Sequence, residues 1–195
     1  MIYINKQNEP KWLNEFKEKN PRADYDSEIF TEHKAELKRE LLKEQKYLCA
    51  YCCCRISMEK SHNEHIEPRH PKTGVSNRSL DYNNLVASCY GFQGEKTCGP
   101  KKQNEYDEEQ FISPLDMECE KRFRYYPNGV MEGDTYTIEL LNLNSYRLRK
   151  AREAVYETIM ELDETTIRLI YDENSDTLEP FFNVVKWYLK NGVRE

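Results

Sequence analysis

The stretch Cys49-Ala50-Tyr51-Cys52 opens the part of the sequence that decides the fold, and Cys89 and Cys98 follow further along the chain. Two cysteines separated by two residues can turn both thiolates toward one tetrahedral cation. A structural zinc ion needs four such ligands, and Cys89 and Cys98 supply the second pair from either side of a loop that contains two glycines. The spacing therefore predicts a zinc site with four cysteine ligands.

Three other cysteines leave part of this assignment open. Cys53 and Cys54 directly follow Cys52, so either of them could replace it as a ligand. Cys119 has no second cysteine at a metal-binding spacing and is expected to be a free thiol. A set of unrelated buried thiols without any metal is the alternative for the whole group.

The sequence shows no sign of secretion or of a membrane span. Its first residues, Met1 to Lys6, lack the charged start and apolar core of a signal peptide. No apolar run approaches the roughly 18 to 20 residues that a transmembrane helix needs. We therefore expect a cytoplasmic protein, in which clustered cysteines bind metal more often than they form disulfides.

The chain is acidic and polar as a whole but basic in its centre. Of its 195 residues 33% are charged and 38% are apolar, and the net charge is −6. Residues 47 to 104 instead carry eight Lys and Arg against five Asp and Glu. A locally basic region in an acidic protein can hold a polyanion such as nucleic acid. The 14 Tyr and 7 Phe argue against a disordered chain.

Helical and hairpin patterns flank this centre. From Ser27, a candidate N-cap, apolar residues recur every four positions and predict a helix over about 28–46. Asn128-Gly129 predicts a hairpin turn, and the apolar spacing from Leu148 to Leu162 predicts another helix. The segment Phe181 to Leu189 has almost no polar side and is expected to be deep core or a partner surface.

Between the cysteine pairs lies His62-Asn63-Glu64-His65-Ile66-Glu67-Pro68, and Asn84-Leu85 follows. Neighbouring residues of an extended segment point to opposite faces, so Glu64 and His65 can serve different partners. A carboxylate suits Mg²⁺, whereas a neutral imidazole can accept a proton from an attacking water. The cation would stabilise the charge that builds up on a phosphate. The pattern predicts phosphodiester hydrolysis.

Over residues 47 to 104, the order Cys49-x-x-Cys52, Glu64-His65-Ile66-x-Pro68, Asn84-Leu85, Cys89, Cys98 and Lys102 resembles an HNH endonuclease. The flanking motifs resemble the PtuB-like HNH subunit of Septu-type and retron-associated anti-phage systems. They are Gln45-x-x-x-Cys49, Ser113-Pro114-Leu115-Asp116, Phe123-x-Tyr125, and Leu140-Leu141-Asn142-Leu143-Asn144 with Leu148 and Arg152.

The resemblance implies an α+β fold with three parts. Residues 1–46 would be an N-terminal helical segment, and residues 47–110 an HNH ββα-metal core with the four-cysteine zinc knuckle. Residues 111–195 would form a hairpin and helices that bind a partner. That partner would be a PtuA-like ABC-type ATPase, and retron-associated members add a retron RNA and a reverse transcriptase.

The resemblance also implies a role for each site residue. His65 becomes the general base, Glu64 a ligand of a catalytic Mg²⁺ or Mn²⁺, and Asn84 the residue that fixes the neighbouring loop. Cys49, Cys52, Cys89 and Cys98 become ligands of structural Zn²⁺.

One position departs from the family pattern. HNH proteins place a His, Asn or Asp ligand just after the last knuckle cysteine, whereas this chain has Gly99-Pro100. His62, which strand alternation puts on the same face as Glu64, is the substitute ligand that we expect. The other candidates are Gln103, Asn104 and Asp116.

Basic residues near the site are the candidates for phosphate contact. We expect Lys101, Lys102 and Arg69 to bind the nucleic-acid backbone, because point charges near a metal suit a polyanion. Ordinary solvated side chains are the alternative for all three.

Three functions remain open from the sequence. The first is a metal-dependent nuclease that acts as the effector of an anti-phage complex with the ATPase. The second is a non-catalytic zinc-stabilised subunit that docks nucleic acid or the ATPase, which the missing ligand favours. The third is a standalone restriction-type HNH enzyme, but an acidic surface attracts phosphate poorly without help.

Overall fold

The computed structural model describes residues 1–68 and 78–192 of the chain. In chain order, the helices, 3₁₀ helices (η) and strands are α1 (Lys11–Lys19), η1 (Glu28–His33), α2 (Lys34–Glu44), β1 (Ser61–His65), η2 (Tyr82–Asn84), β2 (Leu85–Cys89), α3 (Cys98–Lys102), η3 (Cys119–Arg122), β3 (Phe123–Tyr125), β4 (Met131–Gly133), α4 (Thr135–Leu140), α5 (Tyr146–Met160), α6 (Glu164–Ile170) and α7 (Phe182–Asn191).

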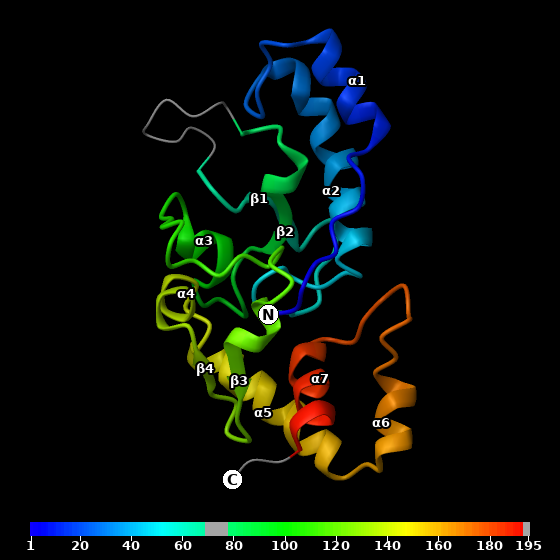
Figure 1. Cartoon of the computed structure of the whole chain (residues 1–195), viewed down its shortest axis with the longest axis vertical. Coiled ribbons are helices and arrows are strands. Elements are labelled where there is room, and N and C mark those ends of the chain that lie inside the picture. Colours follow the sequence, from blue (N-terminus) through cyan, green and yellow to red (C-terminus); the bar gives the residue numbers. More distant parts are fainter. Residues whose placement is uncertain (69–77, 193–195) are drawn as a thin grey trace.

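The elements form a mixed α+β protein with three levels along its longest axis (Figure 1). Helices α1 and α2 lie at one end, the β1–β2 sheet and α3 lie in the middle, and β3, β4 and α4 to α7 lie at the other end. Each sheet has two antiparallel strands. Among the described residues, no helix is long and apolar enough to span a bilayer.

The helix that we expected over 28–46 is regular α-helix only in its second part, α2, because Glu28–His33 form a 3₁₀ turn. Ser27 does not cap this turn with its side chain. Its hydroxyl instead donates to Asp24 Oδ1 and accepts from the Asp24 N–H, both at 2.9 Å. His33 stacks on Trp12 with ring centroids 5.4 Å apart, so its role is packing.

The β1–β2 sheet lies between two helices and holds the middle of the molecule together. The register pairs Ser61 with Cys89 and His65 with Leu85. All five residues of β2 are buried. Helix α2 packs against both strands, and α3 packs against β2. Most polar side chains of the sheet belong to β1, among them His62, Glu64 and His65.

Gln45, at the end of α2, joins that helix to β2 through its side chain. Its Nε2 donates to the carbonyls of Leu48 and Ala87 at 2.8 and 2.9 Å, and its Oε1 accepts from the Ala87 N–H at 2.6 Å. The Gln45 amide thus pairs with backbone groups of β2 as a third strand would.

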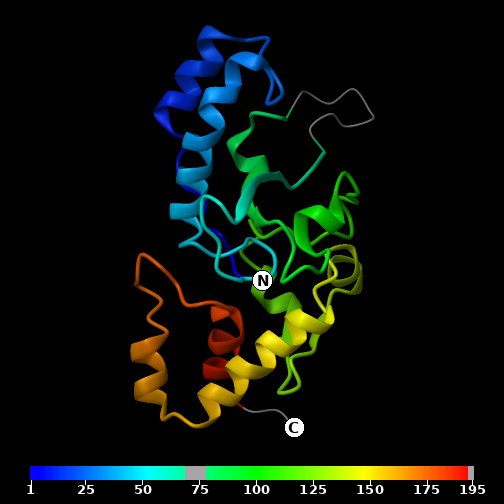
Figure 2. The same cartoon turned by 180° about the vertical axis from the view of Figure 1, so that it is seen from behind.

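The predicted hairpin around Asn128-Gly129 is confirmed as β3 and β4. It rests on α5, because Arg152 of that helix is buried and its Nε donates to the Gly129 carbonyl at 2.7 Å. Asn144 binds the other strand through both backbone groups of Met131, at 2.7 and 2.9 Å. In Figure 2, which is seen from behind, α5 crosses in front of the hairpin.

The apolar segment Phe181 to Leu189 forms most of α7, and its first half is core. Phe181, Phe182, Val184 and Val185 are all buried. The second half is partly buried, with the Tyr188 ring edge-on to Tyr156 of α5 at 5.8 Å. Deep core therefore accounts for much of this segment, and a partner contact there stays a prediction.

One large cluster of buried side chains runs through all three levels. It includes Leu13 of α1, Leu85 of β2 and Leu148 of α5, each with 0% exposure. The expected boundaries after residues 46 and 110 therefore fall within a continuous core, and the division into three functional parts stays a prediction.

Candidate active site and cysteine cluster

The structure brings Cys49, Cys52, Cys89 and Cys98 together. All four are buried, and their sulfur atoms lie within 4.8 Å of one another. The Cys52 and Cys89 sulfurs are 3.9 Å apart, near the roughly 3.8 Å that tetrahedral Zn–S bonds of about 2.3 Å imply. The four thiols therefore fit a zinc ion.

The backbone around Cys49 forms a tight turn that aims the first two thiols inward. The Cys49 N–H donates to the Cys54 carbonyl at 2.9 Å, and the Cys53 N–H donates to the Cys49 carbonyl at 3.0 Å. Cys53 has φ +61°, a left-handed conformation that costs a non-glycine residue about 1 kcal/mol.

The two extra cysteines of this turn differ in position. Cys53 points away from the cluster and packs with Leu48, Leu178 and Phe182. Cys54 stays beside it, and the nearby thiols of Cys49, Cys52 and Cys89 raise its pKa. Cys54 is thus a fifth thiol at the site, whereas Cys53 belongs to the core.

Thiol contacts favour the thiolate at two of the ligand positions. Burial opposes ionisation of Cys49, but hydrogen bonds from Cys52, Cys54, Cys89 and Cys98 hold its pKa well below the ordinary value. The pKa of Cys89 falls to about 5; its contact with Cys49 raises it, but those with Cys52, Cys54 and Cys98 outweigh this. Burial raises the pKa of Cys119 to about 12, as expected of an unreactive free thiol.

His62 and Glu64 project from β1 toward the start of α3. The His62 Nε2 and Glu64 Oε2 atoms are 2.9 Å apart, and Glu64 is 8% exposed. Gly99 lies directly against them: a Cβ atom there would be 2.4 Å from Glu64 Oε2 and 2.7 Å from His62 Nε2. The missing side chain at Gly99 therefore has a steric reason, because Glu64 and His62 fill that space.

Lys102 is buried, although the sequence suggested that it contacts phosphate. It is 1% exposed. Its ammonium donates to the carbonyls of His65 and Gln103 at 3.0 and 3.3 Å and to Glu64 Oε1 at 3.4 Å. Burial lowers the pKa of Lys102, and the Glu64 carboxylate partly opposes that shift.

The other two basic candidates are Lys101 and Arg69. Lys101 is exposed on the same helix. Arg69 lies outside the described residues.

His65 ends β1 and points away from Glu64. Its Nε2–H donates to the Ser79 carbonyl at 2.9 Å, because a carbonyl oxygen can only accept. The edge of its ring meets Tyr25, with centroids 4.9 Å apart and planes at 89°. In the neutral imidazole this arrangement puts the basic lone pair on Nδ1.

Asn84 is 1% exposed, and within the described residues its side chain bonds to backbone groups. Its Oδ1 accepts from the Glu67 N–H at 2.8 Å, and its Nδ2 donates to the carbonyls of Glu67 and Arg78 at 3.2 and 3.3 Å. The amide therefore joins the chain before residue 69 to the chain after residue 77.

Of the candidates for a further metal ligand, His62 lies beside Glu64. Gln103 and Asn104 are exposed, and the Asp116 carboxylate accepts from the Glu118 N–H at 2.9 Å. Within residues 1–68 and 78–192, the four cysteines are the one group of three or more His, Cys, Asp or Glu ligands close enough for a metal.

Glu64 with the adjacent His62 ring nevertheless fits a cation of one kind. Mg²⁺ and Mn²⁺ prefer oxygen ligands, and Mg²⁺ often keeps several waters while one or two carboxylates and a substrate phosphate hold it. His62 fits less well than Glu64, because its Nδ1 is buried with no partner among the described residues, and a ligating histidine usually donates from its second nitrogen.

Tyr90 is a residue that the motif analysis overlooked. It directly follows Cys89, is 61% exposed, and its ring centroid lies 5.1 Å from that of His62. An exposed aromatic ring beside a polar site can stack on a nucleobase. Its place next to a knuckle cysteine was the available signal, but one sequence does not reveal exposure.

Two curated proteins resemble the chain in sequence. "Retron Vc95 putative HNH endonuclease" of Vibrio cholerae is 27% identical over 131 residues, which cover 61% of this chain and 62% of the relative. "Retron Ec83 putative HNH endonuclease" of Escherichia coli is 35% identical over 100 residues, which cover 47% of this chain and 38% of the relative. These similarities support an HNH endonuclease family.

The chain spans less than two thirds of the length of either curated HNH relative. No protein-family model matches it. The two relatives thus support the family alone, and the roles of single residues are proposals that start from the geometry described above.

Proposed function

We propose that the chain is a metal-dependent HNH endonuclease that hydrolyses phosphodiester bonds in nucleic acid. The observation that carries this proposal is the fixed ring of His65, which the Ser79 carbonyl orients at the end of β1. The cysteine cluster joins the next strand, β2, to α3 and to the turn after α2. The β1–β2 sheet and α3 would be the ββα-metal core.

His65 would act as the general base. With Nε2–H donated to Ser79, a neutral ring can take a proton at Nδ1 from a water molecule. The water oxygen then attacks phosphorus, and the bond from phosphorus to the leaving oxygen breaks. The Ser79 carbonyl also stabilises the imidazolium that forms, because its contact with Nε2–H becomes stronger.

Glu64 would hold the catalytic cation, with His62 beside it. A bound Mg²⁺ or Mn²⁺ would supply stabilisation of the negative charge on the phosphate and the leaving oxygen. Asn84 would maintain the site by closing the loop that follows β1. Zn²⁺ on the four cysteines would be structural.

Exposed groups around the site suit a nucleic-acid chain. Lys101 would contact the phosphate backbone, and Tyr90 would stack on a base near the cleaved bond. Both DNA and RNA satisfy this description. Arg69 remains a candidate phosphate contact.

The cellular role would be anti-phage defence. Both similar proteins carry retron names, which supports a setting in which a retron RNA and a reverse transcriptase are further partners. The motif resemblance to PtuB-like subunits adds a PtuA-like ABC-type ATPase, which would deliver or restrain the nuclease.

The test is cleavage of double-stranded DNA, single-stranded DNA and transfer RNA with Mg²⁺ or Mn²⁺, with and without the ATPase. Replacing His65 with Ala should lower cleavage by about 10²- to 10⁴-fold, because the base is lost. His33→Ala is the matched control, since His33 packs on Trp12 away from the site. Equal cleavage by wild type and His65→Ala would refute the assignment.

A second candidate function is a non-catalytic docking subunit. The burial of Lys102 against Glu64 favours it, because the lysine already neutralises the carboxylate that a cation needs. Full anti-phage protection in cells that carry His65→Ala would support this alternative.

A further inference from the structure

Lys102 occupies an unusual position for a lysine. Its side chain is 1% exposed, and its ammonium lies between one oxygen of Glu64 and the backbone carbonyls of His65 and Gln103. A buried ammonium needs such partners to offset its lost hydration. The chain therefore builds a positive charge into the place where Glu64 would meet a catalytic cation.

The two oxygens of Glu64 have different neighbours. Oε1 is 3.4 Å from the Lys102 ammonium, whereas Oε2 is 2.9 Å from His62 Nε2. Gly99 leaves just enough room for this arrangement, because a Cβ atom there would overlap both Glu64 and His62. Helix α3, which lies near the β1–β2 sheet (Figure 1), thus contributes a cation to the site through Lys102.

We propose that Lys102 is a resident cation that competes with the divalent metal ion for Glu64. The inference rests on the proposed nuclease function. With Lys102 protonated and Glu64 ionised, the pair carries no net charge, so a divalent ion gains little attraction and also meets repulsion from the ammonium. A nucleic-acid phosphate would add the negative charge that the site lacks, so tight metal binding would require substrate.

This role differs from that of a lysine that merely supports the fold. A supporting lysine that holds Glu64 in place would weaken metal binding when it is removed. A competing lysine would strengthen metal binding when it is removed. The sign of the change therefore separates the two roles.

The experiment measures Mn²⁺ binding to the zinc-loaded full chain without nucleic acid, by electron paramagnetic resonance of free Mn²⁺. Lys102→Met keeps the length of the buried chain but removes the charge, and it should tighten Mn²⁺ binding about tenfold or more. Lys102→Arg keeps the charge and should bind Mn²⁺ as weakly as wild type. Lys96→Met, at an exposed lysine shortly before α3, is the matched control and should leave the Mn²⁺ affinity within about twofold, because solvent screens its charge.

Zinc content and melting temperature establish that each variant is folded. If Lys102→Met does not fold, Lys102→Gln provides the neutral side chain for the same comparison. Unchanged or weaker Mn²⁺ binding by the folded neutral variant would overturn the inference.

Glu64→Gln separates failure of this inference from failure of the proposed function. If Glu64→Gln removes Mn²⁺ binding while Lys102→Met leaves it unchanged, Glu64 holds the cation as proposed. In that case only the proposed competition between Lys102 and the metal ion is wrong. If Glu64→Gln binds Mn²⁺ like wild type, the cation is held elsewhere, and the cation site of the proposed function fails with the inference. We expect weak Mn²⁺ binding by Lys102→Arg and tight Mn²⁺ binding by Lys102→Met.

Discussion

Gly99 determines how closely β1 and α3 approach at the candidate site. Its lack of a side chain allows Glu64 and His62 to lie directly against the helix backbone. In the motif this glycine stands in place of a metal ligand, whereas in the structure it makes room for two other side chains. Gly99 therefore leaves out a ligand of the family motif and makes room for His62, the substitute ligand that we expect.

Replacing Gly99 with Ala should displace the Glu64 carboxylate, because the new Cβ would lie 2.4 Å from Oε2. We expect cleavage and Mn²⁺ affinity each to fall about tenfold or more, since the displaced carboxylate would no longer hold the cation in place. Zinc content should stay at the wild-type level. Cleavage kinetics, Mn²⁺ titration and zinc analysis measure these three quantities.

Gly94→Ala is the matched control for that substitution. A Cβ at Gly94 would meet no atom within 4 Å, although φ there is +86°. The variant should lose about 1 kcal/mol of stability and keep its cleavage rate. If Gly99→Ala behaves like Gly94→Ala, the close packing at Gly99 has no functional role.

At the scale of single residues, the sequence predicted which cysteines come together better than it predicted which side chains are buried or exposed. The spacing of the four cysteines was enough to expect their convergence, because geometry limits how two C-x-x-C thiolates can turn. The burial of Lys102 could not be predicted from the sequence. Lys101 and Lys102 have identical side chains, and tertiary packing decides which face of their helix is buried. Tyr90 was overlooked for the same reason.

At the scale of elements, the β1–β2 sheet depends on a side chain as well as on strand pairing. Two strands alone are marginally stable in water. Gln45 supplies three hydrogen bonds to the backbone of Leu48 and Ala87. The end of α2 therefore completes the sheet.

Gln45→Ala should lower the free energy of unfolding by about 3 kcal/mol, because it leaves buried backbone groups without partners. Urea denaturation of the zinc-loaded protein measures this loss. Gln7→Ala removes an exposed glutamine and should change stability by less than about 0.5 kcal/mol. Similar values for both variants would contradict the role given to Gln45.

The cysteine cluster joins β2, α3 and the turn after α2, so its metal should control the fold of the middle level. We expect zinc removal by a chelator, or Cys49→Ser, to unfold this region, because metal binding and folding are coupled. Circular dichroism and zinc analysis measure the effect. Wild-type melting and full zinc in Cys49→Ser would exclude the site.

Cys54 allows a finer comparison within the same cluster. Its thiol already contacts Cys49, Cys52 and Cys89, so it can replace Cys52 as a ligand. Cys52→Ser should therefore keep part of its zinc, whereas Cys52→Ser with Cys54→Ser should keep none. Cys53→Ser, whose side chain lies in another cluster, should keep full zinc.

The elements were predictable where local chemistry decides them. Asn128-Gly129 sets the β3–β4 turn, and apolar spacing sets α2 and α5. The 3₁₀ start at Glu28–His33 was not predictable, because Ser27 bonds to Asp24 instead of capping the helix. Aromatic contacts of Phe30 with Phe16 also fix that turn, and these come from distant sequence.

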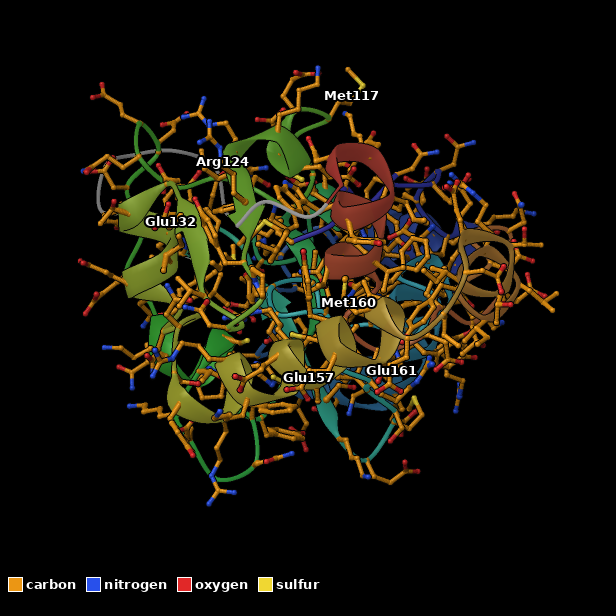
Figure 3. The ribbon with its side chains drawn as sticks, turned by 90° about the horizontal axis from the view of Figure 1, so that it is seen from below. Met117, Arg124, Glu132, Glu157, Met160 and Glu161 are labelled. Carbon is orange, nitrogen blue, oxygen red and sulfur yellow. The ribbon has the colours of Figure 1, made fainter. Side chains whose placement is uncertain are left out.

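At the scale of the whole molecule, exposed apolar side chains concentrate at the end that holds α5 and α6. Leu169 is 80% exposed, and Met160 and Ile170 are each 49% exposed. Figure 3 shows Met160 with Glu157 and Glu161 at the end of α5. This end belongs to residues 111–195, for which the family resemblance implies a partner contact.

Leu169→Asp should weaken co-purification with the ABC-type ATPase, because it places a charge in an apolar contact. The isolated chain should keep its melting temperature, since Leu169 contributes little to the core. Ile29→Asp, at the opposite end of the molecule and 56% exposed, is the control and should leave co-purification unchanged. If Leu169→Asp captures the ATPase as well as wild type does, the contact does not involve Leu169.

Helix α3 has only five residues, yet it begins with Cys98 of the cysteine cluster and ends with Lys102. Under the proposed function, a change at the zinc end of this short helix should therefore reach the catalytic end. Loss of zinc, or oxidation of the four thiols, would then abolish cleavage together with the fold of the cluster. The supply of zinc and the redox state around the protein would thus control whether the chain can cut its substrate.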